Sequence, residues 1–257
     1  AASLDIPYSF GVHARDVRKV APAELRRRAH RAACVIACNR DAVRELERID
    51  VTPELVPHGV DVRRFAPAPL AERGPLRLLA VGRCVEKKGF AVLIEAVAGL
   101  EVAFDLQIIG DGPLRAALER SVAARGLVDR VRFAGSLTHH ELPAAYAAAD
   151  VVVAPSIEDA DGDRDGLPNV VLEAMASGRP VIASEIAAIA SAVRDGETGL
   201  LVAPGDPLAL RAALERVARD RALAGAMGAA ARTLVQQEFE LGACTTRLLD
   251  CLESAYA

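Results

Sequence analysis

Long apolar runs, internal repeats and an excess of positive charge are all missing from this 257-residue sequence. No run reaches the roughly 18 apolar residues of a membrane-spanning helix, and residues 1–6 do not resemble a signal peptide. The formal net charge of −4 leaves no basic footprint for nucleic acid, so we predict no nucleic-acid partner. A hydrophobic fraction of 52% and a charged fraction of 26% exclude general disorder and indicate a globular protein.

Lysine and cysteine are both scarce. Only three of the 31 basic residues are lysines, namely Lys19, Lys87 and Lys88, and with the abundant alanine this bias indicates codon usage and not a binding surface. The five cysteines are odd in number and widely spaced, which is typical of reduced thiols in a reducing compartment. Cys34 and Cys38 have no second pair nearby, so we expect no zinc site there. We predict a cytoplasmic protein and leave peripheral membrane contact open.

Short apolar strands alternate with helical segments along most of the sequence, which favours an α/β fold with parallel sheets covered by crossover helices. The expected strands are residues 8–12, 34–37, 76–81, 104–109, 131–134, 151–154, 181–183 and 199–202. The expected helices are residues 23–32, 40–48, 89–98, 113–124, 138–149, 168–176 and 188–194, followed by a continuous helical tail from residue 206.

One proline-rich stretch interrupts this alternation. Residues 65–75 contain three prolines and a glycine and have no hydrophobic period, so we place a linker at residues 67–75. Residues 76–235 then form a complete doubly wound, Rossmann-like domain. Residues 1–66 hold too few strands for such a domain, and we expect residues 236–257 to be a helix that packs back on them.

The first segment that carries chemistry is residues 82–89. It follows a buried strand and precedes a helix, which is where α/β sheets bind ligands. Gly82 and Gly89 let the backbone approach a ligand closely. Arg83 and Lys88 are cations suited to a diphosphate, although a solvated turn explains the same residues.

The second segment, residues 165–173, also lies between a strand and a helix. The free amides at the start of this helix favour an anion. Glu173 lies further along the helix, and a carboxylate there suits sugar or ribose hydroxyls better than phosphate. The alternative for Glu173 is an ordinary charge on a helix surface.

Together these segments resemble the retaining glycosyltransferases of family 4, which have the GT-B fold. The resemblance extends in the right order over nearly the whole sequence, and its further segments are residues 57–65, 109–114, 146–150, 154–156, 173–178 and 195–202. It implies an enzyme that moves a sugar from a nucleotide-diphospho-sugar to an acceptor hydroxyl with retention at the anomeric carbon. The acceptor is a glycan, a lipid-linked molecule or a small molecule, in cell-envelope polysaccharide or glycolipid synthesis. The nucleotide-sugar is a co-substrate, and no cofactor is implied.

The resemblance also assigns roles to individual residues. Arg83 and Lys88, with Gly82 beside them, would bind the diphosphate and stabilise the leaving group. Glu173 would bind the ribose hydroxyls. Asp165 stands where the family has the first glutamate of a Glu-x7-Glu pair, facing the donor sugar, and it is one methylene shorter. The backbone from Gly166 through Leu167, Pro168, Asn169 and Val170 would hold sugar and phosphate.

Residues 6–16 resemble the late strand of the family's acceptor domain, which ends in a histidine near the reacting centre. His13 would then contact the acceptor or the donor sugar. The family's acceptor domain would begin about 100 residues earlier, so we expect an incomplete acceptor side. Two other functions stay open: a nucleotide-sugar-binding module without turnover, and another GT-B enzyme such as a nucleotide-sugar epimerase.

A possible metal motif in the second segment fails on its spacing. Residues 161–166 match the first half of an EF-hand loop. The bidentate glutamate of that loop would fall at position 172, where this sequence has Leu172, which offers no ligand atom. The Asp-x-Asp pattern in the same stretch precedes a GT-B-type helix. We therefore predict a reaction without a metal ion.

Overall fold

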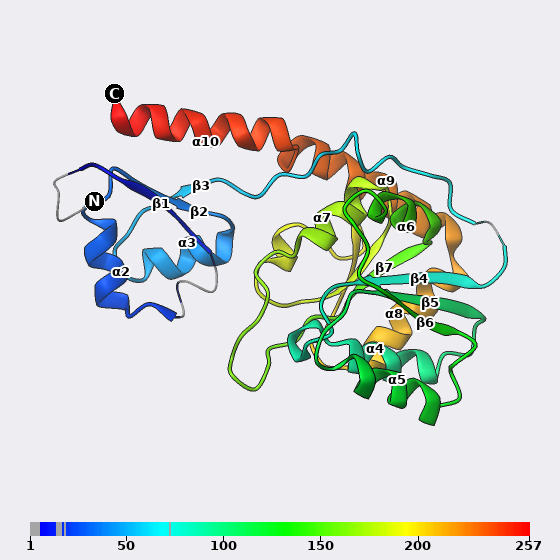
Figure 1. Ribbon diagram of the computed structural model, residues 1–257. Helices are drawn as coiled ribbons and strands as arrows, with labels where there is room; N and C mark the ends of the chain where they lie inside the picture. Colours follow the sequence, from blue (N-terminus) through cyan, green and yellow to red (C-terminus); the bar gives the residue numbers. More distant parts are fainter. Residues whose placement is uncertain (1–5, 14–16, 18, 72) are drawn as a thin grey trace.

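The computed structural model describes residues 6–13, 17, 19–71 and 73–257, and it contains two separate parallel sheets (Figure 1). The first sheet has the order β1-β2-β3 and the second has the order β6-β5-β4-β7-β8-β9. All strand pairs in both are parallel. Within the described residues, no helix is long and apolar enough to cross a membrane.

The smaller sheet belongs to the N-terminal part of the chain. Its strands are β1 (Ser9–Val12), β2 (Cys34–Ala37) and β3 (Glu54–Leu55), and its helices are α2 (Pro22–Ala29) and α3 (Arg40–Glu47). Asn39 caps α3, because its side-chain oxygen accepts a hydrogen bond from the Ala42 amide at 2.9 Å.

The larger sheet is doubly wound. Its strands are β4 (Leu76–Val81), β5 (Phe104–Ile109), β6 (Val131–Gly135), β7 (Val151–Ala154), β8 (Val181–Ser184) and β9 (Gly199–Val202). The chain builds outward from β4 to β6, then returns to the other side of β4 with β7. The carboxyl ends of β4 and β7 therefore form the point where the strand order reverses, which is where such sheets open a crevice.

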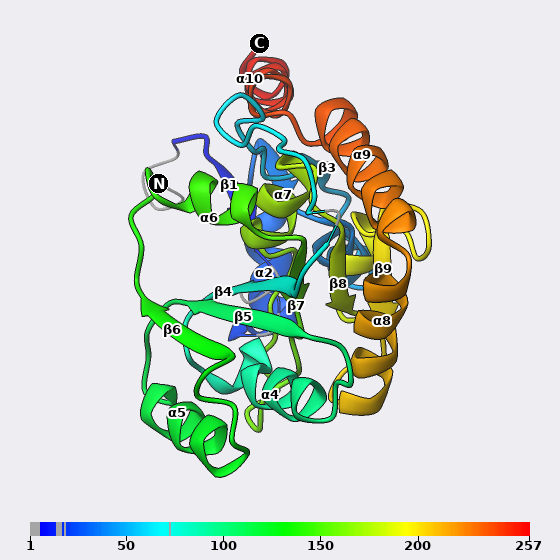
Figure 2. The ribbon, with the colours of Figure 1, turned by 90° about the vertical axis from the view of Figure 1, so that its right-hand side faces the viewer.

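Helices cover both faces of the larger sheet (Figure 2). Leu78 and Ala80 of β4 pack into the core on the side of α4 (Phe90–Ala98), α5 (Arg115–Ala124) and α8 (Pro207–Arg219). Leu79 packs into the opposite core, with α6 (Leu142–Ala148), α7 (Asn169–Ala176) and the later part of α9 (Arg221–Glu238). Burial on both faces explains why these strands are almost continuously apolar. Two 3-10 turns complete the element order, η2 (Glu86–Lys88) and η3 (Ile189–Ser191).

The C-terminal tail differs from the continuous helix that the sequence predicts. It consists of α8, α9 and α10 (Leu241–Tyr256), with breaks at Asp220 and at Phe239–Glu240. The side chains of Asp220 and Glu240 accept hydrogen bonds from Leu223 and Ala243 amides and so begin new helices. Helix α10 extends along the smaller sheet (Figure 1), where the Ser9 hydroxyl donates to the Tyr256 hydroxyl at 3.1 Å.

Thr138 and Glu141 contact one another at the start of the helix that the sequence predicts over residues 138–149. Glu141 accepts hydrogen bonds from both the amide and the hydroxyl of Thr138, at 2.7 Å each. The hydroxyl therefore donates to Glu141 and does not cap the helix, and α6 begins only at Leu142. The helix expected over residues 188–194 is likewise shorter, because only the 3-10 turn η3 forms there.

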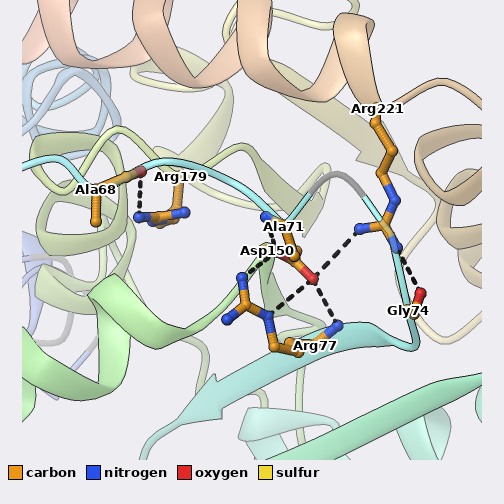
Figure 3. A network of polar contacts seen from close by, with 7 residues as sticks. All are labelled: Ala68, Ala71, Gly74, Arg77, Asp150, Arg179 and Arg221. Atoms are coloured by element: carbon orange, nitrogen blue, oxygen red, sulfur yellow. Dashed lines mark hydrogen bonds and ion pairs between the residues drawn. The ribbon is translucent and has the colours of Figure 1, made fainter.

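Buried charges hold the proline-rich stretch against the larger domain (Figure 3). The Asp150 carboxylate is fully buried, accepts the Ala71 amide at 3.1 Å and pairs with the Arg77 guanidinium at 2.6 Å. Arg179 is also fully buried and donates to the Ala68 carbonyl at 2.5 Å. The stretch is thus fixed at several points, although its sequence has no regular pattern.

Candidate functional site

The loops after β4 and β7 meet at the reversal point of the larger sheet. The Ile157 amide donates to the Lys87 carbonyl at 2.9 Å, which joins the two loops directly. Gly89 has a φ of +64°, and a Cβ there would overlap the Pro155 carbonyl oxygen. Gly89 is therefore required both by its left-handed backbone and by the closeness of the second loop.

Gly82 makes room for a cation of the same loop. A Cβ at Gly82 would lie 3.2 Å from the methylenes of the Lys88 side chain. Lys88 thus lies across Gly82, and its ammonium reaches the Asp165 carboxylate at 2.6 Å. The two residues that the sequence assigns to the diphosphate and to the donor sugar are in direct contact.

Both lysines of the first segment form ion pairs in the structure. Lys88 and Asp165 neutralise one another, while Lys87 pairs with Asp163 at 3.0 Å and with Asp165 at 3.4 Å. Burial alone lowers the pKa of Lys87, but the hydrogen bond that Lys87 donates to Asp163 and the charge of Asp165 outweigh burial and raise it. Arg83 is exposed and forms no ion pair within the part of the chain that the structure describes.

Helix α7 supplies the other wall. It begins at Asn169 after Pro168, and no side chain caps its N-terminus. Pro168 is buried and has no backbone N–H, so it starts the helix and donates nothing to a ligand. Gly166, Leu167 and Val170 lie partly exposed around this helix start. The partial positive charge there favours an anion.

Glu173 is buried, so the alternative of an ordinary surface charge is wrong. Only 9% of Glu173 is exposed, and its Oε2 accepts a hydrogen bond from the Tyr146 hydroxyl at 2.8 Å. Burial, and then the adjacent Glu173 charge, raise the pKa of Tyr146 well above its usual value. Tyr146 therefore stays protonated and fixes the orientation of the carboxylate, a role that sequence reasoning missed although Tyr146 lies in one of the matched segments.

His13 lies on the smaller sheet, beside residues that sequence reasoning did not connect with it. Its imidazole stacks on that of His58 with ring centroids 5.1 Å apart. Ligand atoms of His13, Cys38 and His58 all lie within 4.8 Å of one another. Burial, and then the nearby His13, lower the pKa of His58. Residues 14–16 of the predicted segment lie outside the described residues.

The edges of the two sheets face one another across a cleft. A cavity of about 160 Å³ is lined by Cys38, Asn39 and Arg40, between the end of β2 and the start of α3, and by Leu167 before α7. An ion pair of 3.7 Å between Arg164 and Asp41 also crosses from one side to the other. Of the predicted site residues only Leu167 lines this cavity, while His13 lines a separate one together with Cys38 and His58.

This architecture is that of a GT-B protein, and comparison with known proteins identifies its family. Residues 75–220 match the family described as "Glycosyl transferases group 1", and this match covers more than half of the chain. The chain belongs to this family. The predicted α/β fold of GT-B type and the predicted resemblance to glycosyltransferases are confirmed at this level.

Two curated relatives are named as biosynthesis glycosyltransferases. The chain is 37% identical to the amylovoran biosynthesis glycosyltransferase AmsK of Erwinia amylovora, over 70% of this chain and 45% of the relative. It is 36% identical to the putative colanic acid biosynthesis glycosyltransferase WcaL of Salmonella typhimurium, over 76% of this chain and 50% of the relative. The chain thus spans about half the length of these relatives.

Solved structures show the same architecture. Sucrose-phosphate synthase from Thermosynechococcus elongatus superposes with a TM-score of 0.84 at 28% identity, covering 99% of this chain and 70% of that one. HepE from Anabaena, solved in complex with UDP, superposes with a TM-score of 0.86 over 96% of this chain and 72% of that one. At 20% identity, the likeness to HepE shows the fold alone.

Proposed function

We propose that this chain binds a nucleotide-diphospho-sugar at the crevice between β4 and β7 and takes part in transferring the sugar to an acceptor hydroxyl with retention of configuration. The observation that carries the proposal is the arrangement around that crevice. An unpaired arginine, a lysine–aspartate pair, an uncapped helix start and a buried glutamate all lie at the carboxyl ends of the same strands.

Arg83 and Lys88 bind the diphosphate in this proposal. Both cations stabilise the negative charge that develops on the leaving nucleotide as the glycosidic bond breaks. Lys88 shares its ammonium between Asp165 and the phosphate, because the ion pair already occupies one side of it. Asp165, held at that position, faces the donor sugar. The start of α7, from Gly166 to Val170, holds the remaining phosphate oxygens.

Glu173 binds the ribose of the nucleotide. One of its oxygens already accepts the Tyr146 hydroxyl, so the carboxylate is oriented before the ligand arrives. An ionised carboxylate accepts several hydrogen bonds at once, and those from ribose hydroxyls are charge-assisted. Its negative charge repels the diphosphate, which favours the sugar end of the nucleotide.

The acceptor side includes His13, which directly follows β1 at the carboxyl end of the smaller sheet. We propose that His13 contacts the acceptor or the donor sugar and that the reaction needs no metal ion. HepE has been solved with UDP-glucose, and another relative is named as a GDP-mannose-dependent mannosyltransferase. Both UDP-sugars and GDP-sugars are therefore candidate donors. Cell-envelope glycans are among the candidate acceptors.

Isothermal titration of UDP and GDP, each against its nucleoside, tests the donor site. Arg83→Ala removes one charge-assisted contact worth about 1.5–3 kcal/mol. Because Arg83 is exposed, we expect the low end, a loss of about tenfold in nucleoside diphosphate affinity. Nucleoside affinity should stay unchanged. Arg120→Ala is the matched control, because Arg120 is likewise an exposed arginine and lies on α5. Equal losses for diphosphate and nucleoside would contradict the assignment.

Retention is tested separately, without a known acceptor. The chain is expected to hydrolyse an α-linked nucleotide-sugar slowly and to release the free sugar. Proton NMR, recorded before mutarotation, then shows which anomer forms first. The proposal predicts the α-anomer. First formation of the β-anomer would contradict retention while leaving donor binding intact.

A further inference from the structure

Three side chains with metal-ligand atoms converge at the carboxyl edge of the smaller sheet. His13 follows β1 directly, Cys38 follows β2 directly, and His58 lies three residues after β3. The strands are parallel and in register, and the Cys38 amide continues the ladder by donating to the Val12 carbonyl at 3.3 Å. Neighbouring strands therefore bring residues that are far apart in sequence to one place, and their ligand atoms lie within 4.8 Å of one another.

We propose that His13, Cys38 and His58 bind one zinc ion. Two imidazole nitrogens and one thiolate are ligands that zinc prefers. Tetrahedral zinc, with Zn–N of about 2.0–2.1 Å and Zn–S of about 2.3 Å, holds its ligand atoms about 3.4–3.6 Å apart. A shift of about 1 Å at the ends of the side chains closes the remaining gap, and the two exposed imidazoles have room to turn.

The Cys38 sulfur contacts a polar side chain that is held in place. The Asn39 side-chain amide donates a hydrogen bond to the Cys38 sulfur at 3.3 Å. Asn39 is itself buried and held in place, because its other side-chain atom caps α3. Zinc binding releases the thiol proton to solvent, and the Asn39 contact then supports the ligating sulfur.

The site has room for a fourth ligand. All three residues line a cavity of about 360 Å³ whose far wall is formed by α10. The nearest thiol on that wall, Cys244, donates to the Glu238 carbonyl at 3.8 Å and is outside the cluster. The fourth position is therefore left to water or to a small ligand. If His13 contacts the reacting sugar, zinc competes with that contact, a consequence that rests on the proposed function.

Zinc titration of the tag-free chain against a chromophoric chelator tests the site, with cobalt as a spectroscopic substitute. We expect one zinc per chain, no competition from magnesium, and a thiolate-to-cobalt charge-transfer band. Cys38→Ser should abolish the band and weaken zinc binding by at least about tenfold, and His58→Ala should weaken it equally. Cys34→Ser, at the other end of the same strand, is the matched control and should bind as the unmutated chain does.

Two results would overturn the proposal. One is equal zinc affinity in Cys38→Ser and the unmutated chain. The other is cobalt binding without a thiolate band in the unmutated chain, a measurement that does not depend on whether any variant folds. Because no nucleotide is present, neither result depends on the proposed transferase activity.

Discussion

Replacing Asp165 by asparagine separates the two roles of the Lys88–Asp165 pair. If Lys88 binds the donor diphosphate, Asp165 competes for the same ammonium. The Asp165→Asn variant keeps the shape and removes one negative charge beside the phosphate. We therefore expect tighter binding of UDP or GDP, together with a loss of sugar transfer, because the carboxylate that faces the donor sugar is gone.

The structure sets the size of this gain. The pair is 2.6 Å long, and the side chains of Lys88 and Asp165 are only 18% and 14% exposed, so solvent screens them only in part. A carboxylate and a phosphate that share one ammonium lie about 5 Å apart, which at an effective dielectric of about 20 gives a repulsion of about 3 kcal/mol as an upper limit. Because Lys87 also contacts Asp165 and relieves part of the repulsion, we expect about 1.4 kcal/mol, a tenfold gain.

Isothermal titration of the unmutated chain, Asp165→Asn and Asp163→Asn measures this gain. Asp163 is the matched control, because it carries the same charge in the same loop and pairs with Lys87 instead. The tenfold gain should appear only in Asp165→Asn. Unchanged or weaker diphosphate binding in that variant would show that Lys88 does not face the phosphates.

Three further predictions concern Glu173, metal ions and Asp150. Glu173→Gln should weaken ribonucleotide binding by about tenfold and leave the 2′,3′-dideoxy analogue nearly unaffected, and an equal loss for both would make Glu173 structural. EDTA should not lower donor binding or transfer, and restoration of lost activity by magnesium or manganese would refute metal-independence. Asp150→Ala should destabilise the fold by about 3 kcal/mol in urea unfolding at pH 7, since it leaves Arg77 and Arg221 without their buried partner. Burial raises the pKa of Asp150, but hydrogen bonds from Arg77 and from backbone amides outweigh burial and lower it. The stabilisation by Asp150 is thus present above the unfolded-state pKa of about 3.9 and is lost as the pH falls through the lower folded-state value. The difference between variant and unmutated chain should shrink in acid, and a constant difference would contradict this.

The sheets could be predicted because local signals determine them. Leu76–Val81 and Cys34–Ala37 form strands with the expected bounds, since a short run of buried apolar residues suits a parallel strand and little else. The breaks in the C-terminal tail were not predicted, because their local signal is ambiguous. Asp220 and Glu240 cap new helices, yet acidic residues also occur inside helices, so the sequence alone does not distinguish the two.

The site residues could be predicted individually but not their pairings. Lys88 and Asp165 are 77 positions apart, and nothing local indicates that they neutralise one another. Tyr146 lies 27 positions before Glu173, and its hydrogen bond depends on how α6 and α7 pack. Such contacts follow from tertiary structure, as does the convergence of Cys38 and His58 on His13. The one usable signal is that each of the three lies just after a strand.

A crystal structure of this chain with a bound nucleoside diphosphate tests the central claim most directly. The account predicts the diphosphate between residues 82–89 and the start of α7, with oxygens within hydrogen-bond distance of Arg83 and Lys88. It also predicts the ribose hydroxyls on Glu173. A nucleotide bound elsewhere, or bound here with its base or phosphates on Glu173, would contradict the account.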